Sequence, residues 1–202
     1  MKGRIMFEQN GQKFWELPNI ISVTRIASIP LIMVFLLWDC RWTRLIAAII
    51  FTISSLSDLL DGYLARKLEK TSKAGKLLDP LADKLLMLAG LVMLIPLKMI
   101  PAWIVVIIIG REIAITGLRG IASSEGIIIS ASNWGKKKTL VLSIAAVMLI
   151  MGPQNNFFGV TWNEVGFILL LVGMGLSLYS GWDYFDKLKR DWSGNEKVKE
   201  EK

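Results

Sequence analysis

Long apolar stretches separated by short charged connections dominate this chain. A helix needs about 20 mostly apolar residues to cross the hydrocarbon core of a bilayer. Six stretches approach that length, and they cover residues 19–38, 44–65, 77–97, 101–122, 138–153 and 163–183. The fifth is short unless its helix extends back through Ser132, Asn133 and Trp134. The pattern predicts an all-α, polytopic membrane protein with six transmembrane helices.

Basic residues flank these stretches unevenly. Eighteen Lys and Arg residues gather on one side of the predicted membrane, and three, Arg41, Arg44 and Lys98, lie on the other. Cytoplasmic loops are the ones enriched in Lys and Arg. We therefore expect a multi-pass protein of the bacterial cytoplasmic membrane, with both termini and the loop at 66–76 facing the cytoplasm.

The two ends of the chain differ from its apolar centre. Residues 1–17 mix charged with aromatic side chains and lack the continuous apolar core of a signal peptide. We expect them to remain as a cytoplasmic or interfacial segment, either amphipathic or a plain flexible tail. Residues 18–189 form the predicted transmembrane domain, and residues 190–202 form a charged cytoplasmic tail.

Composition limits the chemistry that is available. The chain is 53% hydrophobic with a net charge of +7, which suits an anionic membrane surface. We expect no nucleic-acid partner, because the basic residues flank apolar segments instead of forming a stripe with exposed aromatics. The chain has no histidine and one cysteine, Cys40, which excludes a Cys/His zinc site and a Ser-His-Asp triad. Catalysis would rest on carboxylates, Lys, Arg, hydroxyls and hard metal ions.

Four aspartates interrupt the apolar pattern where the second stretch ends and the third begins. Asp58 and Asp61 are three residues apart, and Asp79 and Asp83 are four apart, so each pair lies on one helix face. A short loop between the helices would bring the four carboxylates together near the membrane surface. Buried carboxylates need a cationic partner. Oxygen ligands suit Mg²⁺ or Mn²⁺; two ions would neutralise four aspartates, although one ion with nearby Lys and Arg could suffice.

Residues near these aspartates provide space and positive charge for a ligand. Gly62, Ala65 and Gly75 are small enough for a ligand to approach the backbone closely. Arg66 lies at the water boundary, where its guanidinium can bind phosphate oxygens. Simpler interpretations stay open: helix packing for the glycines, a membrane-surface anchor for the arginine, and a helix N-cap for Asp79, which precedes a proline.

The stretch from Asp58 to Asp83 resembles the signature of the CDP-alcohol phosphotransferases. It reads Asp58-x-x-Asp61-Gly62-x-x-Ala65-Arg66, then eight residues, then Gly75-x-x-x-Asp79-x-x-x-Asp83. Three weaker segments extend the resemblance along nearly the whole chain: Pro18 to Arg25, with Ser22 where Thr is frequent, Arg111 to Arg119, and Gly135 to Thr139. The resemblance implies a six-helix membrane enzyme, usually a homodimer, that transfers a phosphatidyl-type group from a CDP-linked lipid to an alcohol and releases CMP.

Basic residues in and after the fourth stretch indicate an acceptor alcohol that carries its own phosphate. Arg111 and Arg119 lie eight residues apart, about two turns on one helix face, and Lys136 to Lys138 begin the next span on the same side. sn-Glycerol 3-phosphate fits such a clamp; inositol phosphate, serine and phosphatidylglycerol are the alternatives within the family. An ion pair of Arg111 with Glu112, or topology anchoring by the lysines, is the simpler interpretation.

Together these residues make up the expected site of an enzyme of phospholipid biosynthesis. The metal ligands would be Asp58, Asp61, Asp79 and Asp83, with Asp83 also the catalytic base. CDP-diacylglycerol would meet Asn19, Ser22, Arg25, Gly62, Ala65, Arg66 and Gly75. The acceptor phosphate would meet Arg111, Arg119, Lys136 and Lys138. A divalent-cation transporter is the alternative from another class, but its acidic residues would follow a path across the bilayer instead of clustering at one mouth.

Overall fold

The structure is a computed structural model. It describes the backbone of residues 17–68, 73–125, 133–153, 156–157 and 160–200. Side chains are described for residues 22–57, 81–125, 134–153 and 161–192. The N-terminal segment 1–16 therefore lies outside the described residues.

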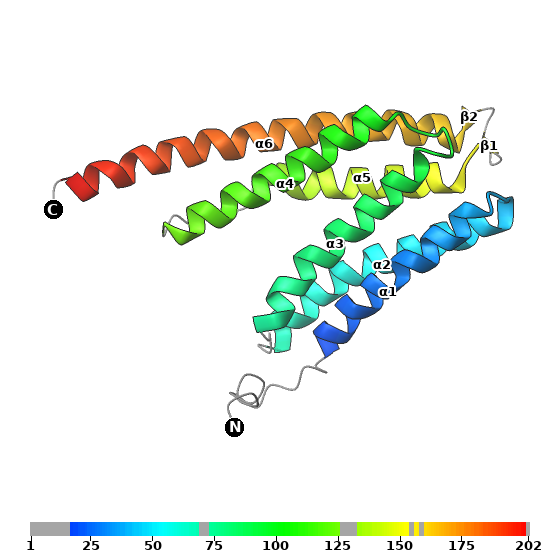
Figure 1. The fold of residues 1–202 in the computed structure, drawn as a ribbon, viewed down its shortest axis with the longest axis horizontal. Helices are drawn as coiled ribbons and strands as arrows, with labels where there is room; N and C mark the ends of the chain where they lie inside the picture. Colours follow the sequence, from blue (N-terminus) through cyan, green and yellow to red (C-terminus); the bar gives the residue numbers. More distant parts are fainter. Residues whose placement is uncertain (1–16, 69–72, 126–132, 154–155, 158–159, 201–202) are drawn as a thin grey trace, which may run out of the picture.

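Six α-helices make up nearly all of the described backbone (Figure 1). They are α1 (Leu17–Leu37), α2 (Arg41–Leu68), α3 (Lys73–Leu94), α4 (Ala102–Ser124), α5 (Asn133–Met151) and α6 (Trp162–Glu200). Between α5 and α6, the two-residue strands β1 (Asn156–Phe157) and β2 (Val160–Thr161) pair antiparallel. The predicted all-α fold with six helices is confirmed, and the small hairpin is an addition that the apolar pattern did not predict.

Two helix boundaries refine the sequence-based predictions. α5 begins at Asn133, so the fifth stretch does extend back into its polar flank. α6 continues to Glu200, past residue 183, where the apolar stretch was predicted to end. Its charged part carries ion pairs with i,i+4 spacing, Asp183 with Lys187 and Asp186 with Arg190, and such pairs stabilise an exposed helix.

The structure also decides one of the open alternatives. α3 begins at Lys73, so Asp79 lies inside the helix and not at its N-terminus. An N-cap role for Asp79 is therefore wrong. Pro80, the next residue, also lies inside α3 and does not mark the start of the helix.

The helices form two groups that meet at one end of the molecule. In Figure 1, α1, α2 and α3 run together, while α4 and α5 run along α6. The groups converge near the α1–α2 turn and the β1–β2 hairpin, and they separate toward the opposite end. Contacts of α2 and α3 with α5, and of α3 with α4, join the two groups.

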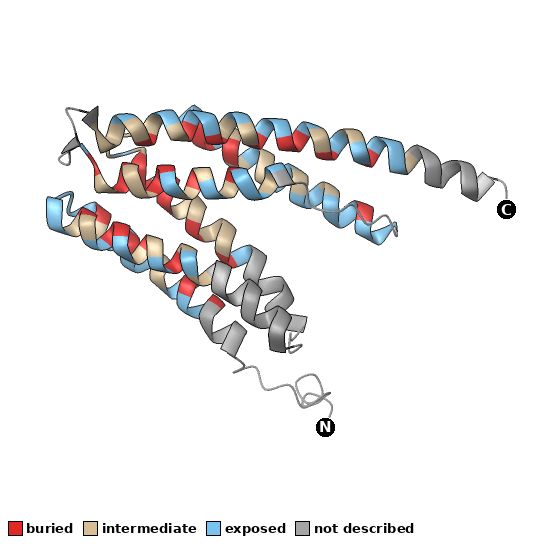
Figure 2. Ribbon diagram, turned by 180° about the vertical axis from the view of Figure 1, so that it is seen from behind, coloured by how far each residue is buried: buried red, intermediate tan, exposed pale blue. Residues whose placement is uncertain are grey.

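The core lies along the helix interfaces, where Figure 2 shows the buried positions. Phe51 and Ile104 are fully buried there. A Cβ at Gly90 of α3 would lie 2.8 Å from the Phe51 ring, and one at Gly173 of α6 would lie 2.6 Å from Leu142. Glycine at these positions brings α3 against α2 and α6 against α5.

The outer surface is unusually apolar. Exposed side chains include Trp42, Ile53, Trp103, Val106 and Trp182. Among the described residues, Trp162–Trp192 is the one helical segment long and apolar enough to cross a membrane by itself, and Ser22–Leu37 is a shorter apolar helix. α4 is similarly apolar but carries three charged residues along its length.

A buried arginine stabilises the end of the molecule where the two helix groups meet. Arg44 of α2 is 3% exposed and pairs with Asp39 in the α1–α2 turn. Gly152, which follows α5, has a φ of +74°, and a Cβ there would collide with the Arg44 guanidinium. Glycine is favoured at such a backbone conformation, and here it also makes room for the arginine.

Candidate active site

A cavity of about 800 Å³ opens between the two helix groups. All helices from α2 to α6 contribute to its wall. The volume is in the range of pockets that bind organic ligands. Its position between the two groups, lined by Asp83 and by basic residues of α4 and α5, makes it the candidate site.

The cavity combines a charged part with an apolar wall. Along α5, the lining runs from Gly135 to Met148, a distance of roughly 20 Å at 1.5 Å per residue. Leu140, Ile144 and Val147 make the α5 wall mostly apolar beyond the lysines. Such a cavity can accept a molecule that has both a charged head and a hydrocarbon part.

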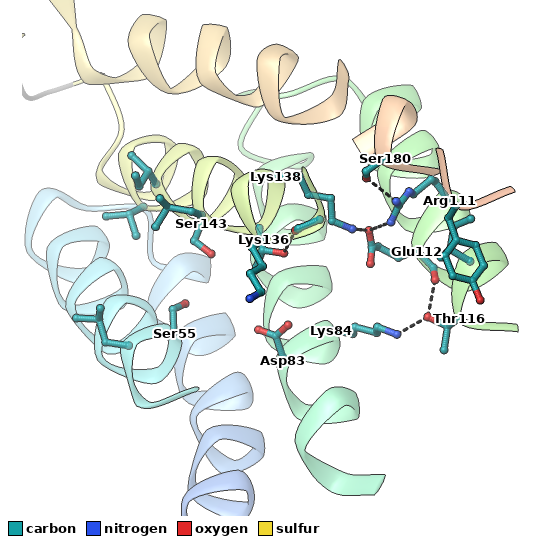
Figure 3. A pocket seen from close by; sticks show the side chains of 18 of the residues that line it. Ser55, Asp83, Lys84, Arg111, Glu112, Thr116, Lys136, Lys138, Ser143 and Ser180 are labelled. Carbon is teal, nitrogen blue, oxygen red and sulfur yellow. Dashed lines mark hydrogen bonds and ion pairs between the residues drawn. The ribbon is translucent and has the colours of Figure 1, made fainter. Parts of the chain in front are cut away.

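Asp83 is the predicted metal ligand whose side chain is described. It projects from α3 into the cavity, and Figure 3 shows it and Lys136 of α5 directed toward one another. α2 and α3 are in contact, so the helices that carry the other three aspartates adjoin. The side chains of Asp58, Asp61 and Asp79 lie outside the described residues.

A cluster of alternating charges lies on the other side of the cavity. Arg111 Nη1 is 2.8 Å from Glu112 Oε1, and Lys138 Nζ of α5 pairs with the same oxygen. Arg111 Nη2 donates a hydrogen bond to Ser180 Oγ of α6 at 2.6 Å. Glu112 therefore holds two cations from different helices beside each other, and one of the two is also held from α6 (Figure 3).

Two further contacts place cations around this cluster. Lys84 of α3 donates a hydrogen bond to Thr116 of α4, which ties the two helix groups together inside the cavity. Arg119, two turns after Arg111 on α4, lies 5.5 Å from the centre of the Tyr184 ring. That distance is suitable for a cation–π interaction.

The structure brings five of the predicted site residues to one cavity. They are Asp83, Arg111, Arg119, Lys136 and Lys138. The simpler interpretation of Arg111, an ion pair with Glu112, is also present. Arg111 still lines the cavity despite this ion pair. Because Lys138 shares the Glu112 carboxylate, two cations are paired with a single anion.

Two of the residues expected near the nucleotide, Ser22 and Arg25, have described side chains, and neither lines this cavity. Ser22 and Arg25 of α1 are buried, and Arg25 Nε donates to the backbone oxygen of Ser54 in α2 at 3.1 Å. This contact joins α1 to α2 away from the cavity lining. The remaining expected residues, Asn19, Gly62, Ala65, Arg66 and Gly75, have side chains outside the described part of the chain.

Sequence reasoning missed three residues of the site. Glu112 was considered only as a local partner of Arg111, whereas it also binds Lys138, 26 residues further along the chain. Ser180 and Tyr184 lie on the last helix, and Ser180 is 69 residues from its partner Arg111. Glu112 leaves one weak signal in the sequence, since it is a Glu inside a long apolar stretch; the two α6 residues leave none.

Comparison with known proteins identifies the class. Residues 15–179 match the family model described as CDP-alcohol phosphatidyltransferase. The chain belongs to this family. The match includes the whole aspartate motif and the charged residues of α4 and α5.

Several curated relatives share one name, CDP-diacylglycerol–glycerol-3-phosphate 3-phosphatidyltransferase. The protein of Bacillus subtilis (strain 168) is 40% identical over 185 residues, which cover 86% of this chain and 95% of that protein. That of Rickettsia bellii is 31% identical over 174 residues, covering 86% of this chain and 96% of its own. A second form from Arabidopsis thaliana is 33% identical, covering 90% and 83%.

Proposed function

We propose that this chain transfers a phosphatidyl group from CDP-diacylglycerol to sn-glycerol 3-phosphate. The products are phosphatidylglycerophosphate and CMP, which is the activity of a phosphatidylglycerophosphate synthase in phospholipid biosynthesis. The names of the relatives support this choice. The observation that carries it is the shared cavity of Asp83 with Arg111, Arg119, Lys136 and Lys138.

The charges of the cavity suit an acceptor with its own phosphate. Arginine and lysine side chains bind phosphate oxygens by charge-assisted hydrogen bonds. Four such side chains on α4 and α5 line the cavity, whereas an uncharged or zwitterionic alcohol such as serine needs far fewer. The apolar wall of α5 adjoins these cations, which suits a lipid donor that must meet a polar acceptor.

The carboxylate oxygens of the four-aspartate motif suit a divalent metal ion. Asp58, Asp61, Asp79 and Asp83 supply oxygen ligands, the chain has no histidine, and the two helices that carry them adjoin. We propose Mg²⁺ or Mn²⁺ at these four carboxylates. When bound, the metal would neutralise the diphosphate charge and stabilise the leaving CMP.

The chain's own residues bind and orient the acceptor and deprotonate its hydroxyl. Arg111, Arg119, Lys136 and Lys138 hold the acceptor phosphate and direct the free hydroxyl toward Asp83. Asp83 takes the hydroxyl proton, and the acceptor oxygen forms a bond to the phosphorus that bears the diacylglycerol. The bond from that phosphorus to the CMP oxygen breaks, and CMP leaves with the electron pair.

The proposed acceptor is tested by CMP release from CDP-diacylglycerol in detergent. The purified protein is given Mg²⁺ and one acceptor at a time: sn-glycerol 3-phosphate, inositol phosphate, serine or phosphatidylglycerol. We expect release with glycerol 3-phosphate alone. Release with another alcohol, and none with glycerol 3-phosphate, would retain the family and refute this substrate.

We also propose that the helices span the bacterial cytoplasmic membrane with the cavity on the cytoplasmic side. The apolar outer surface supports this arrangement, and so does the excess of basic residues on one side. Cys40, the single cysteine, is exposed in the α1–α2 turn, which would then face outward. The Thr43 hydroxyl donates a hydrogen bond to its sulfur and lowers the pKa of the thiol, which favours the reactive thiolate.

Cys40 gives a direct test of this orientation. A maleimide that cannot cross membranes should label it in intact spheroplasts, and Cys40→Ser should abolish the labelling. Labelling that requires permeabilised cells would show the opposite orientation.

A further inference from the structure

One turn of α6 lies directly behind both arginines of the charged cluster. Ser180 and Gly181 contact Arg111, and Tyr184 contacts Arg119. The family model ends at residue 179, one residue before this turn. These contacts are therefore a property of this chain that the family match does not describe.

Ser180 is set to accept a hydrogen bond from Arg111. Its side chain is 3% exposed, and its hydroxyl donates to the backbone oxygen of Ser177, one turn earlier, at 3.1 Å. With its proton used in this way, the oxygen offers its lone pairs to Arg111 Nη2 at 2.6 Å. The α6 backbone thus fixes the direction of one guanidinium nitrogen.

Gly181 leaves the space in which the same guanidinium lies. A Cβ at this position would be 2.9 Å from Arg111 Nε and 3.5 Å from its Cγ. Real Cβ atoms do not approach other atoms so closely. Any side chain at residue 181 must therefore displace Arg111 within the cavity.

Tyr184 supports Arg119 by its ring. It is 6% exposed and packs with Ala122 and Leu188 between α4 and α6. Its hydroxyl has no hydrogen-bond partner among the described residues. The ring face, 5.5 Å from the Arg119 guanidinium carbon, is accordingly the part that acts on the arginine.

We propose that Ser180, Gly181 and Tyr184 are positioning residues that set the two arginines for the phosphate of the acceptor. The inference rests on the proposed function, since it assigns these arginines to that phosphate. Preorganised donors bind an anion more tightly than donors that must first be ordered. This turn of α6 would therefore determine the KM for the acceptor and leave the KM for CDP-diacylglycerol unchanged.

Two alanine variants of the same helix provide a matched test. Gly181→Ala places a methyl group against Arg111, whereas Gly175→Ala, on the same helix, places one where no atom lies within 4 Å. We expect the KM for glycerol 3-phosphate to rise about tenfold in Gly181→Ala, the size of one lost hydrogen bond to a charged group. Gly175→Ala should match the wild type.

Ser180→Ala provides a second test in case Gly181→Ala does not fold. It removes one oxygen and adds no atom, and we expect about the same tenfold rise. Tyr184→Leu should raise the acceptor KM about threefold through loss of the ring face. Tyr184→Phe keeps the ring and should restore most of that loss.

The outcomes separate this inference from the function on which it rests. Wild-type protein without glycerol 3-phosphate-dependent CMP release would refute the proposed function itself. Active wild type, with Gly181→Ala and Ser180→Ala both at the KM of Gly175→Ala, would refute the positioning role alone. Equal rises in the KM for both substrates would also refute it, because a general packing defect does not distinguish acceptor from donor.

Discussion

Arg44, which is buried, and Arg111, which is partly buried, have closely similar surroundings and different positions in the molecule. Each pairs with an acidic residue near it in sequence, Asp39 and Glu112 respectively. Each also lies against a glycine, Gly152 or Gly181, where a Cβ would meet its guanidinium. Arg44 lies where the helix groups converge, and Arg111 lies where they separate.

The two arginines differ in what their guanidinium groups contact. Arg44 is packed between the α1–α2 turn and the end of α5, and it does not line the cavity. Arg111 lines the cavity together with Lys138 and Arg119. An acidic partner and a close glycine therefore do not by themselves indicate a ligand site; the same local arrangement stabilises the helix junction at Arg44 and lines the cavity at Arg111.

The largest effect should come from Asp83, which lines the same cavity as Arg111. Asp83→Asn removes the proposed base, and we expect turnover to fall by about 10³-fold, within the usual range for a general base. Binding of CDP-diacylglycerol should persist. CMP release and a lipid-binding assay on the same preparation measure the two quantities, and substantial remaining turnover would exclude Asp83 as the base.

The same substitution at both arginines tests the comparison itself. Arg111→Lys keeps the charge but cannot contact Glu112 and Ser180 at once, so we expect the acceptor kcat/KM to fall about 30-fold. Arg44→Lys should leave the kinetics unchanged and lower the melting temperature. If Arg44→Lys changed the acceptor KM as much as Arg111→Lys does, the division into a structural and a binding arginine would be wrong.

A smaller effect is expected for the acidic partners. Glu112→Gln leaves Arg111 and Lys138 without a counter-charge, and we expect a loss of about 1.5 kcal/mol of stability. Asp39→Asn should cost less, because Asp39 is half exposed and its ion pair is screened by solvent. Melting temperatures in one detergent measure both; an equal or larger loss for Asp39→Asn would contradict the ranking.

The sequence predicted those parts of the site that lie on single helices. The spacing of Asp79 and Asp83, and of Arg111 and Arg119, is helical, so each pair could be placed on one face from the period alone. Lys136 and Lys138 were recognisable because they open an apolar span. The structure adds that residues from α3, α4 and α5 share one cavity.

Contacts between distant helices could not be predicted in this way. Arg111 meets Ser180 because α4 runs along α6, and no spacing within either helix encodes that meeting. The Gly152 contact with Arg44 likewise depends on how the α1–α2 turn packs against the end of α5. The exact end of α6 was also beyond prediction, since its charged part carries ion pairs and has no apolar stripe to mark where the helix stops.

Transfer of labelled glycerol 3-phosphate into lipid tests the central claim most directly. The purified protein is incubated in detergent with CDP-diacylglycerol, Mg²⁺ and sn-[¹⁴C]glycerol 3-phosphate, and both chloroform-soluble label and CMP are measured. The account predicts that the two appear in equal amounts and only when both substrates are present. CMP release without glycerol 3-phosphate, or label that stays in the aqueous phase while CMP forms, would contradict it.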